Sequence, residues 1–315
     1  MPVNPSSSSV RARSSVARRR PATATRLTAG FVVMRGSLYG PMRMGLWFLA
    51  AALAAGCARG DAVRLSSAPD SGGGLVDMRV VRPDGPGPFP AVVWLHSCAG
   101  LVRGARHAED WTRRLRGLGY VVAIPDSFSA RGFPNGVCGY GLRVPPRTRA
   151  DDAYAALRHL EERPDVVAER IGVIGHSHGG WTVLAAMDAE VAARARATAG
   201  ARHAFAAAIA FYPECAAGAW VRGYRAIAPL LILAGELDDW TPAAPCQRLA
   251  DRARADGQPV SIVVYPRAYH SFDSYAPVTR IPEALQGRGA TIGGDNAARE
   301  DSITQVETFL ARYLR

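Results

Sequence analysis

A serine flanked by glycines stands at the end of an apolar segment. Residues 171–174 lead directly into Gly-His-Ser-His-Gly-Gly at 175–180, and a helical pattern follows. The spacing G-x-S-x-G between a strand and a helix is typical of a nucleophile elbow, a tight turn that lifts a serine hydroxyl to the edge of a sheet. We therefore predict that Ser177 is a nucleophile. The alternative is a glycine-rich turn without chemistry.

A serine hydroxyl is a weak nucleophile at neutral pH, so it needs a base and an acid that orients the base. In folds with this elbow the chain order is serine, acid, histidine. Asp238 and His270 occur in that order, and each follows closely after an apolar segment. We therefore predict the triad Ser177, His270 and Asp238. The neighbouring Asp239 is the alternative acid, and we expect it to cap the following helix instead.

The negative charge that develops on a carbonyl oxygen during attack is stabilised by backbone N–H groups. One expected donor is the amide of His178, the residue after the nucleophile. The second is the amide of Cys98, in the loop after segment 91–96. His96, His176 and His178 could alternatively suggest a metal site. Because two of them stand only two positions apart and no acidic third ligand accompanies them, we expect no metal and no other cofactor.

The elements that must position these residues alternate along the chain. Short runs of apolar and β-branched residues predict strands at 75–82, 91–96, 121–125, 171–175, 206–212, 230–234 and 261–265. Helical patterns lie at 107–118, 148–162, 179–196, 243–256 and 296–314, and a loop near the mouth of the site is expected at 280–294. Strands that are apolar on both faces and separated by helix-length segments are typical of buried parallel sheets. We therefore predict a single α/β domain over 75–315, with a mostly parallel, doubly wound sheet flanked by helices.

The positive charge of the chain is concentrated at its N-terminal end. The 315 residues carry a formal net charge of +11, and all 38 basic residues are arginines. Residues 1–45 hold eight arginines and no acid, whereas residues 58–315 hold 30 arginines against 27 acids. The folded part is therefore nearly neutral, and we predict no nucleic-acid partner. No apolar run reaches the roughly 18 residues that a membrane-spanning helix needs.

The segment 1–57 has the composition of a disordered extension followed by an export signal. Arg43 precedes an apolar run at 46–55, which is too short to span a membrane as a permanent helix. A small, polar stretch at 58–74 then predicts a linker. The alternatives are a translation start at a later methionine, and a cytoplasmic protein with a disordered tail and one buried helix.

The apolar run ends in Ala-Ala-Gly-Cys at 54–57, which resembles a bacterial lipobox. In such a motif the cysteine, here Cys57, becomes the lipidated first residue of the mature protein. An ordinary signal-peptidase site at 52–54 is the alternative. We therefore expect an exported protein, either periplasmic or tethered to a membrane by a lipid at Cys57.

Four further cysteines lie in the folded part of the chain. An even number of cysteines in an exported protein is compatible with disulfides. Cys215 follows one predicted strand and Cys246 begins the helix after the next strand, while Cys98 and Cys138 both lie in loops at the carboxyl edge of the sheet. We therefore predict the pairs Cys98–Cys138 and Cys215–Cys246. Four buried free thiols are the alternative.

Several motifs together resemble the dienelactone hydrolase-like branch of the α/β-hydrolases over residues 75–312. They are LHSCAGL (95–101), GYVVAIPDSFSARG (119–132), RADDAYAAL (149–157, including Asp152), GHSHGG (175–180), AFYPEC (210–215), LILAGELDDWTPAAPC (231–246) and VVYPRAYHSFD (263–273). The resemblance implies a serine or cysteine nucleophile with aspartate and histidine, hydrolysis of esters or lactones, and no metal or organic cofactor. The founding dienelactone hydrolases have cysteine at the elbow where this chain has Ser177. The resemblance therefore implies ester hydrolysis without implying dienelactone itself as the substrate.

The sequence as a whole predicts a serine hydrolase of small-molecule esters or lactones that works through an acyl-enzyme on Ser177. His270 would act as the general base, Asp238 would orient it, and the amides of His178 and Cys98 would hold the oxyanion. A thioesterase, peptidase or acyltransferase would use the same triad with a different pocket. A non-catalytic exported binding protein on the same scaffold is the alternative from another class, because fold alone does not guarantee activity.

Overall fold

The computed structural model describes residues 60–67, 74–139, 143–216 and 223–315. The chain divides into two units, Met1–Ala54 and Ala55–Arg315, and the described residues all belong to the second. The expected export signal and Cys57 therefore lie outside the described residues. No helix of the described part is both long enough and apolar enough to cross a membrane.

The described residues form an eight-stranded sheet with the order β1-β2-β4-β3-β5-β6-β7-β8. The strands are β1 (Asp61–Ser66), β2 (Leu75–Val81), β3 (Phe89–Leu95), β4 (Val121–Pro125), β5 (Val166–His176), β6 (Ala207–Phe211), β7 (Leu230–Gly235) and β8 (Val260–Tyr265). The strands from β4 to β8 in this order pair in parallel, and only β1 and β2 run antiparallel to their neighbours. The predicted α/β architecture with a mostly parallel sheet is confirmed.

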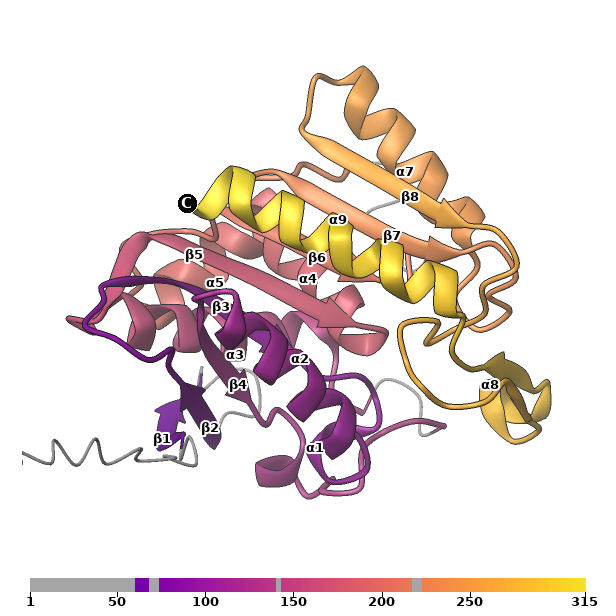
Figure 1. Cartoon of the computed structure of the whole chain (residues 1–315), viewed down its shortest axis with the longest axis horizontal. Coiled ribbons are helices and arrows are strands. Elements are labelled where there is room, and N and C mark those ends of the chain that lie inside the picture. Colours follow the sequence, from indigo (N-terminus) through magenta and orange to yellow (C-terminus); the bar gives the residue numbers. More distant parts are fainter. Residues whose placement is uncertain (1–59, 68–73, 140–142, 217–222) are drawn as a thin grey trace, which may run out of the picture. The chain divides into compact units, whose positions relative to one another are not determined.

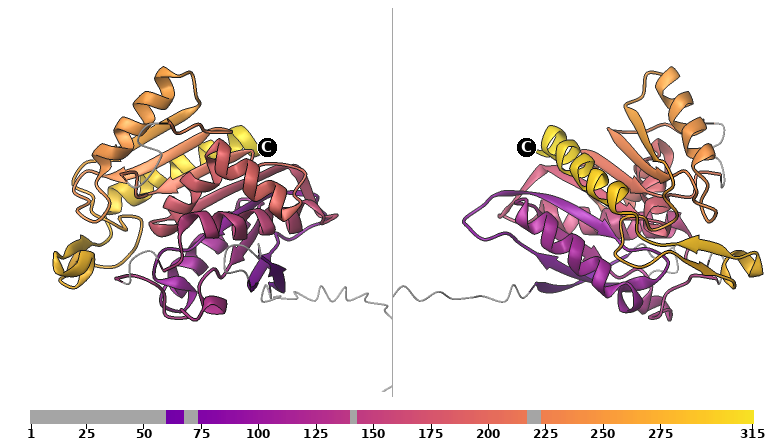
Figure 2. Two further views of the ribbon diagram at one scale, coloured as in Figure 1. Left: turned by 180° about the vertical axis from the view of Figure 1, so that it is seen from behind. Right: turned by 45° about the vertical axis from the view of Figure 1, so that its right-hand side comes forward.

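Helices cover both faces of the sheet (Figures 1 and 2). They are α1 (Gly100–Arg103), α2 (Ala105–Gly117), α3 (Pro146–Glu161), α4 (His178–Met187), α5 (Ala189–Ala199), α7 (Ala243–Ala255), α8 (Ala284–Gly287) and α9 (Asn296–Leu314), with a 3-10 turn η2 at Ser129–Arg131. Side chains of β3 alternate between two cores: Val92 and Trp94 pack with α2 and α9, whereas Val93 and Leu95 pack with α3, α4, α5 and α7. This period of two along a strand that is buried on both sides is why β3 reads as a continuous apolar run.

The predicted linker 58–74 is wrong over residues 61–66. These residues form β1, which pairs antiparallel with β2 at the edge of the sheet. Val63 and Leu65 are more buried than their exposed neighbours Ala62, Arg64 and Ser66, as expected for a strand with one buried side. Two apolar residues are too few for this alternation to stand out within a polar stretch.

Two further predictions of local structure are corrected. The expected single helix at 179–196 is two helices that meet at Asp188, whose carboxylate accepts a hydrogen bond from Val191 N at the start of α5. The expected loop at 280–294 includes all but the first residue of β9 (Thr279–Ile281), together with α8 and β10 (Ala290–Ile292), and the two strands pair antiparallel. We call residues 279–292 the cap hairpin. Its strands have only three residues each, so no sequence period could identify them.

Candidate active site

Ser177 lies in a sharp turn between β5 and α4. β5 ends at His176 and α4 begins at His178, so that a single residue changes the direction of the chain. The φ angle of Ser177 is +55°, a value that non-glycine residues rarely adopt, and its amide donates a hydrogen bond of 3.0 Å to the carbonyl oxygen of Phe211. Backbone strain of this kind is typical of functional positions, where the surrounding structure holds it in place. The predicted elbow therefore has the expected strand–turn–helix setting.

The glycines around Ser177 are required by close backbone packing. A Cβ atom on Gly175 would lie 2.2 Å from the carbonyl oxygen of Gly179, and one on Gly179 would lie 2.1 Å from that of Leu95. A Cβ atom on Gly180 would lie 2.6 Å from the carbonyl oxygen of Phe211. Backbone atoms therefore leave no room for a side chain at Gly175 and Gly179, the two glycines of G-x-S-x-G, or at Gly180, the glycine that follows.

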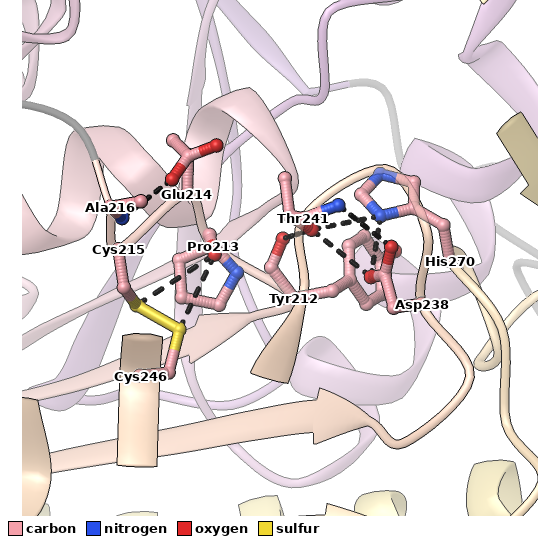
Figure 3. The surroundings of a disulfide bond; sticks show 9 residues. All are labelled: Tyr212, Pro213, Glu214, Cys215, Ala216, Asp238, Thr241, Cys246 and His270. Carbon is pink, nitrogen blue, oxygen red and sulfur yellow. Dashed lines mark hydrogen bonds and ion pairs between the residues drawn. A yellow bond between two sulfur atoms is a disulfide. The ribbon is translucent and has the colours of Figure 1, made fainter. Parts of the chain in front are cut away.

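The structure brings Ser177, His270 and Asp238 together as a hydrogen-bonded chain. Nε2 of His270 lies 2.9 Å from Oγ of Ser177, and Nδ1 of His270 lies 2.8 Å from Oδ2 of Asp238. All three side chains are buried, and they follow the carboxyl ends of β5, β8 and β7. Since an ionised carboxylate accepts only, Nδ1 of His270 donates to Asp238, which leaves Nε2 free to accept the serine proton. Figure 3 shows the histidine and the aspartate of this chain.

Thr241 completes the support of Asp238 (Figure 3). Oδ1 of Asp238 accepts hydrogen bonds from the amides of Trp240 and Thr241 at 2.9 and 2.8 Å. The Thr241 hydroxyl lies 3.0 Å from Oδ2 of Asp238 and also 3.0 Å from the carbonyl oxygen of Tyr212. The ring of Trp240 stacks on His270 with 5.2 Å between ring centres. Thr241 was not predicted from the sequence, although an aspartate followed by a threonine three residues later is a recognisable turn signal.

Asp239 does not cap the following helix. The residue before α7 is Pro242, and no side chain caps that helix. Asp239 instead accepts a hydrogen bond of 2.6 Å from the amide of Thr291 and lies 3.3 Å from the guanidinium of Arg280. Both partners belong to the cap hairpin. Asp239 therefore ties the cap hairpin to the loop that carries Asp238. It cannot cap α7, because that helix begins at Ala243, four residues further along the chain.

The two expected oxyanion donors flank the nucleophile from different loops. Among the described residues, neither the amide of His178 nor the amide of Cys98 donates a hydrogen bond to another protein group. The His178 amide is unpaired because it belongs to the first turn of α4, where no preceding carbonyl is in reach. Cys98 lies on the wall of the same cavity as Ser177. Both amides thus remain available to a substrate.

Both predicted disulfides are formed. Cys98 is bonded to Cys138 and Cys215 to Cys246. The first bond joins the loop after β3 to a loop that also pairs with it through the backbone, since the amide of Val137 donates to the carbonyl oxygen of Cys98 at 2.7 Å. The second disulfide is buried near the loop that carries Asp238 and Thr241, as Figure 3 shows.

A cavity of about 340 Å³ lies directly over Ser177 and His270. Its walls include Trp240, the Cys98–Cys138 disulfide, and Ile281, Glu283, Ala284 and Ile292 of the cap hairpin. The end of the cap hairpin is held against the loop that carries His270: Ile292 forms a β-bridge with His270, and the amide of Gly293, the next residue, donates to the carbonyl oxygen of His270 at 2.9 Å. The expectation that segment 280–294 lies near the mouth of the site is confirmed. A second cavity, of about 360 Å³, lies beside Trp111 and lacks both Ser177 and His270.

The sequence of this chain matches the model of the dienelactone hydrolase family over residues 76–314. The chain belongs to the dienelactone hydrolase family. The predicted resemblance is thereby confirmed, and family membership makes the chain a hydrolase that acts on ester or lactone bonds.

Relatives and solved structures agree with this assignment. A protein of Methylorubrum extorquens named for carboxymethylenebutenolidase is 26% identical over 238 residues, which cover 68% of this chain and 74% of the relative. A dienelactone hydrolase-like promiscuous phosphotriesterase from metagenomic libraries has a TM-score of 0.55 at 22% identity, covering 81% of this chain and 99% of that one. Esterase 2 of Thermogutta terrifontis has a TM-score of 0.56 at 16% identity, covering 81% and 94%. At these identities the solved structures show the shared fold.

This dienelactone hydrolase family member also contains a buried polar cluster around Asp273, which sequence reasoning missed. Asp273 accepts hydrogen bonds from the Tyr212 hydroxyl at 2.7 Å and from Trp111 Nε1 at 2.8 Å, and lies 2.7 Å from His107 Nε2. Burial alone would raise the pKa of Asp273, but His107 and His176 together lower it well below its usual value. Tyr212 packs against His270 with ring centres 4.7 Å apart, so this cluster supports one side of the triad.

The histidines considered as metal ligands from sequence do not gather at one point. Within the described ranges, the group whose donor atoms lie close enough to hold a metal ion is His107, His176 and Asp273. His178 and His96 do not belong to it, because Nδ1 of His178 lies beside Arg149 and Nε2 of His96 accepts from the amide of Ser127. Hydrogen bonds to Asp273 account for the position of His107 without an ion.

Proposed function

We propose that this family member hydrolyses carboxylic esters or lactones through an acyl-enzyme on Ser177. Oγ of Ser177 attacks the substrate carbonyl carbon while its proton moves to Nε2 of His270. Asp238 holds the histidine in the tautomer that can accept this proton and stabilises the imidazolium that results. The amides of His178 and Cys98 accommodate the oxyanion of the tetrahedral intermediate.

The intermediate then collapses and the carbon–oxygen bond to the leaving group breaks. His270 donates its proton to the departing alkoxide. With an ester the product leaves as an alcohol, and with a lactone the new hydroxyl group stays attached to the acyl chain. Water enters, His270 takes one of its protons, and the resulting hydroxide attacks the acyl-enzyme. Collapse of the second intermediate releases the carboxylic acid and returns the proton to Ser177. No step requires a metal or organic cofactor.

The continuous hydrogen-bonded chain from Ser177 Oγ through His270 to Asp238 is the observation that carries this proposal. A non-catalytic binding protein would have no need to keep a strained serine at φ +55° within 2.9 Å of a histidine nitrogen. The cavity of about 340 Å³ over the serine is of a size that suits a small ester or lactone. A relative named for carboxymethylenebutenolidase supports the same substrate class.

A fluorophosphonate tests this proposal, because it phosphonylates only a serine that a nearby base activates. We expect one adduct on Ser177 in the full-length protein, and none in the Ser177→Ala and His270→Ala variants. Ser127→Ala is a matched control, because Ser127 is also buried but lies outside the triad. In this variant the labelling of Ser177 and the esterase activity should stay unchanged. A folded protein without an adduct, or one labelled at another residue, would contradict the proposal.

We further propose that the protein is exported and tethered through a lipid on Cys57. Two disulfides in the folded part support an oxidising compartment, since such bonds are rare in the cytosol. The apolar run at 46–55 and the Ala-Ala-Gly-Cys sequence that ends at Cys57 support recognition as a lipoprotein. Mass spectrometry of the native N-terminus should find a diacylated or triacylated Cys57. A Cys57→Ala variant should be released from the membrane fraction, and an unmodified terminus upstream of residue 46 would contradict export.

A further inference from the structure

A buried arginine connects the two segments that carry the expected oxyanion donors. Arg149 lies in the first turn of α3 and is fully enclosed by protein. Its Nη2 donates a hydrogen bond of 2.8 Å to the carbonyl oxygen of His96, and its Nη1 lies 2.9 Å from Nδ1 of His178. One side chain therefore contacts both the residue two positions before Cys98 and the residue that follows the nucleophile.

The charge of Arg149 is not used in an ion pair. Among the described residues no carboxylate pairs with it, since the nearby Asp152 binds both Nη atoms of Arg131 at 2.8 and 2.9 Å. The ring of Phe128 covers the guanidinium, with 4.8 Å from its centre to Cζ of Arg149. Burial lowers the pKa of Arg149 to about 9, so the guanidinium stays charged at neutral pH. Asp152 and Asp126 stabilise this charge through space and Arg131 opposes it, but no carboxylate of the described part contacts the guanidinium directly. A buried charge without a directly bonded carboxylate is costly, which suggests that Arg149 has a role beyond packing.

The contact with Arg149 fixes the state of His178. Arginine has donors only, so Nδ1 of His178 must accept and the imidazole carries its proton on the other nitrogen. Burial, reinforced by the charge of Arg149, holds the pKa of His178 well below its usual value. The side chain of His178 is therefore a neutral, fixed acceptor, and its backbone at the start of α4 is held with it.

We propose that Arg149 is a positioning residue that fixes the oxyanion hole by tying the loop of His96 and Cys98 to His178 at the start of α4. The planar guanidinium presents its donors at fixed angles, so one rigid group sets the separation of the two segments. Its buried positive charge beside both segments also favours the negative charge that develops on the substrate oxygen. This inference rests on the proposed function, because only a tetrahedral intermediate on Ser177 needs both amides at once.

The Arg149→Met variant of the full chain separates this role from simple packing. With p-nitrophenyl acetate we expect kcat to fall about 10²-fold, the order found when an oxyanion donor is lost, while KM changes less than about threefold. Phenylboronic acid adds to an active serine and forms a tetrahedral anion that needs the same hole. Its inhibition constant should therefore rise by about the same factor as kcat falls. A structural role alone would lower stability without this parallel loss.

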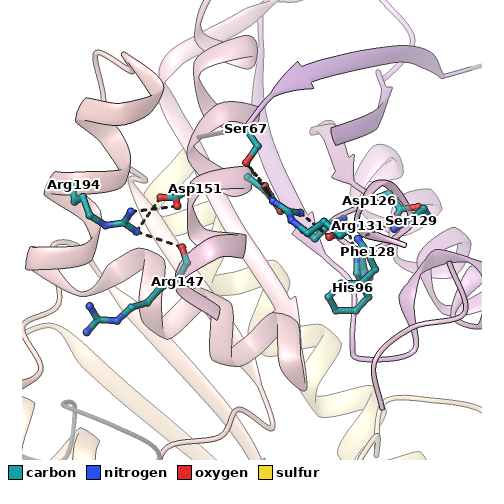
Figure 4. A network of polar contacts seen from close by, with 11 residues as sticks. Ser67, His96, Asp126, Phe128, Ser129, Arg131, Arg147, Asp151 and Arg194 are labelled. Carbon is teal, nitrogen blue, oxygen red and sulfur yellow. Dashed lines mark hydrogen bonds and ion pairs between the residues drawn. The ribbon is translucent and has the colours of Figure 1, made fainter. Parts of the chain in front are cut away.

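Arg131→Met is the matched control. Arg131 is a partly buried arginine of the same region, and it contacts Ser127 and Asp152 but neither His96 nor His178 (Figure 4 shows its surroundings). This variant should lose stability, because it leaves the buried Asp152 unpaired, yet keep kcat and phenylboronic acid affinity within about threefold.

A second variant covers the case in which Arg149→Met does not fold. Arg149→Lys keeps the charge but cannot reach both partners with a single ammonium, so we expect a folded protein with about tenfold lower kcat and weaker phenylboronic acid binding. Unchanged kcat and affinity in Arg149→Lys, or a loss of kcat in Arg149→Met without a loss of affinity, would overturn the role of Arg149. Labelling of Ser177 in the unaltered protein tests the proposed function separately, so the two failures are distinguishable.

Discussion

Adjacent aspartates in this chain have different partners and should have different effects on catalysis. Asp238 bonds to His270, whereas Asp239 bonds to Thr291 of the cap hairpin. We predict that Asp238→Asn lowers kcat by about 10³- to 10⁴-fold, because an amide no longer selects the correct tautomer of His270. Asp239→Asn should leave kcat within about threefold and raise KM, because it loosens the cap hairpin over the cavity. Steady-state kinetics on one soluble ester compares the two, and equal losses of kcat would contradict the assignment of the acid.

At the scale of single residues, spacing was sufficient to predict that Ser177, His270 and Asp238 come together, but not which residues hold them in place. Ser177, Asp238 and His270 could be predicted because each follows a strand that reads as a run of apolar residues. Arg149 and Asp273 could not, because a charged residue in a helix or loop usually faces solvent. Only the fold shows that helix α3 and the end of the histidine loop turn these two side chains inward.

Helices and strands could be predicted where their burial requires a long pattern of apolar residues in the sequence. Strands β3, β4, β6 and β7 and the longer helices were found near their observed bounds, because strands covered on both faces are apolar throughout. β5 begins at Val166, before the predicted start at 171, because its first part includes the exposed Glu169 and Arg170. β1 and the cap hairpin were missed because a few residues at a sheet edge or over a cavity carry no period. The separation of α4 from α5 was missed because a capping aspartate, Asp188, looks like an ordinary exposed residue within a helical pattern.

The two disulfides join different elements and should affect different properties. Cys98–Cys138 braces the loop that carries an expected oxyanion amide, so the Cys98→Ser/Cys138→Ser double variant should lose kcat by about tenfold or more. Cys215–Cys246 joins the segment after β6 to α7 and spans 31 residues, so its double serine variant should lose about 2–4 kcal/mol of unfolding free energy.

Kinetics on one ester and urea unfolding of both double variants separate these effects. We expect the first variant to show its main loss in kcat and the second its main loss in stability, with kcat close to that of the unaltered protein. A wild-type kcat in the Cys98→Ser/Cys138→Ser variant would show that the oxyanion loop holds its position without the disulfide.

At the scale of the whole molecule, three buried histidines link stability to pH. Burial lowers the pKa of His176 to about 4 and, with the charge of Arg149, holds the pKa values of His96 and His178 well below the usual value. In the unfolded chain these histidines titrate near 6.5. Below that pH the unfolded state therefore binds protons that the folded state does not bind. The free energy of unfolding must fall as the pH falls from about 7 towards 4.

Urea unfolding at pH 7.5 and pH 5.0 should show this loss, at roughly 2 kcal/mol for each buried histidine. Carboxylates such as Asp273, whose pKa is well below its usual value, contribute only at lower pH and do not confuse the comparison. The His176→Phe variant removes one titrating group and keeps a ring that can stack on Phe211, so its loss between the two pH values should be smaller by roughly 2 kcal/mol. Equal unfolding free energies of the unaltered protein at the two pH values would show that these histidines bind protons in the folded state. That result would contradict the neutral state of His178, in which its Nδ1 accepts a hydrogen bond from Arg149.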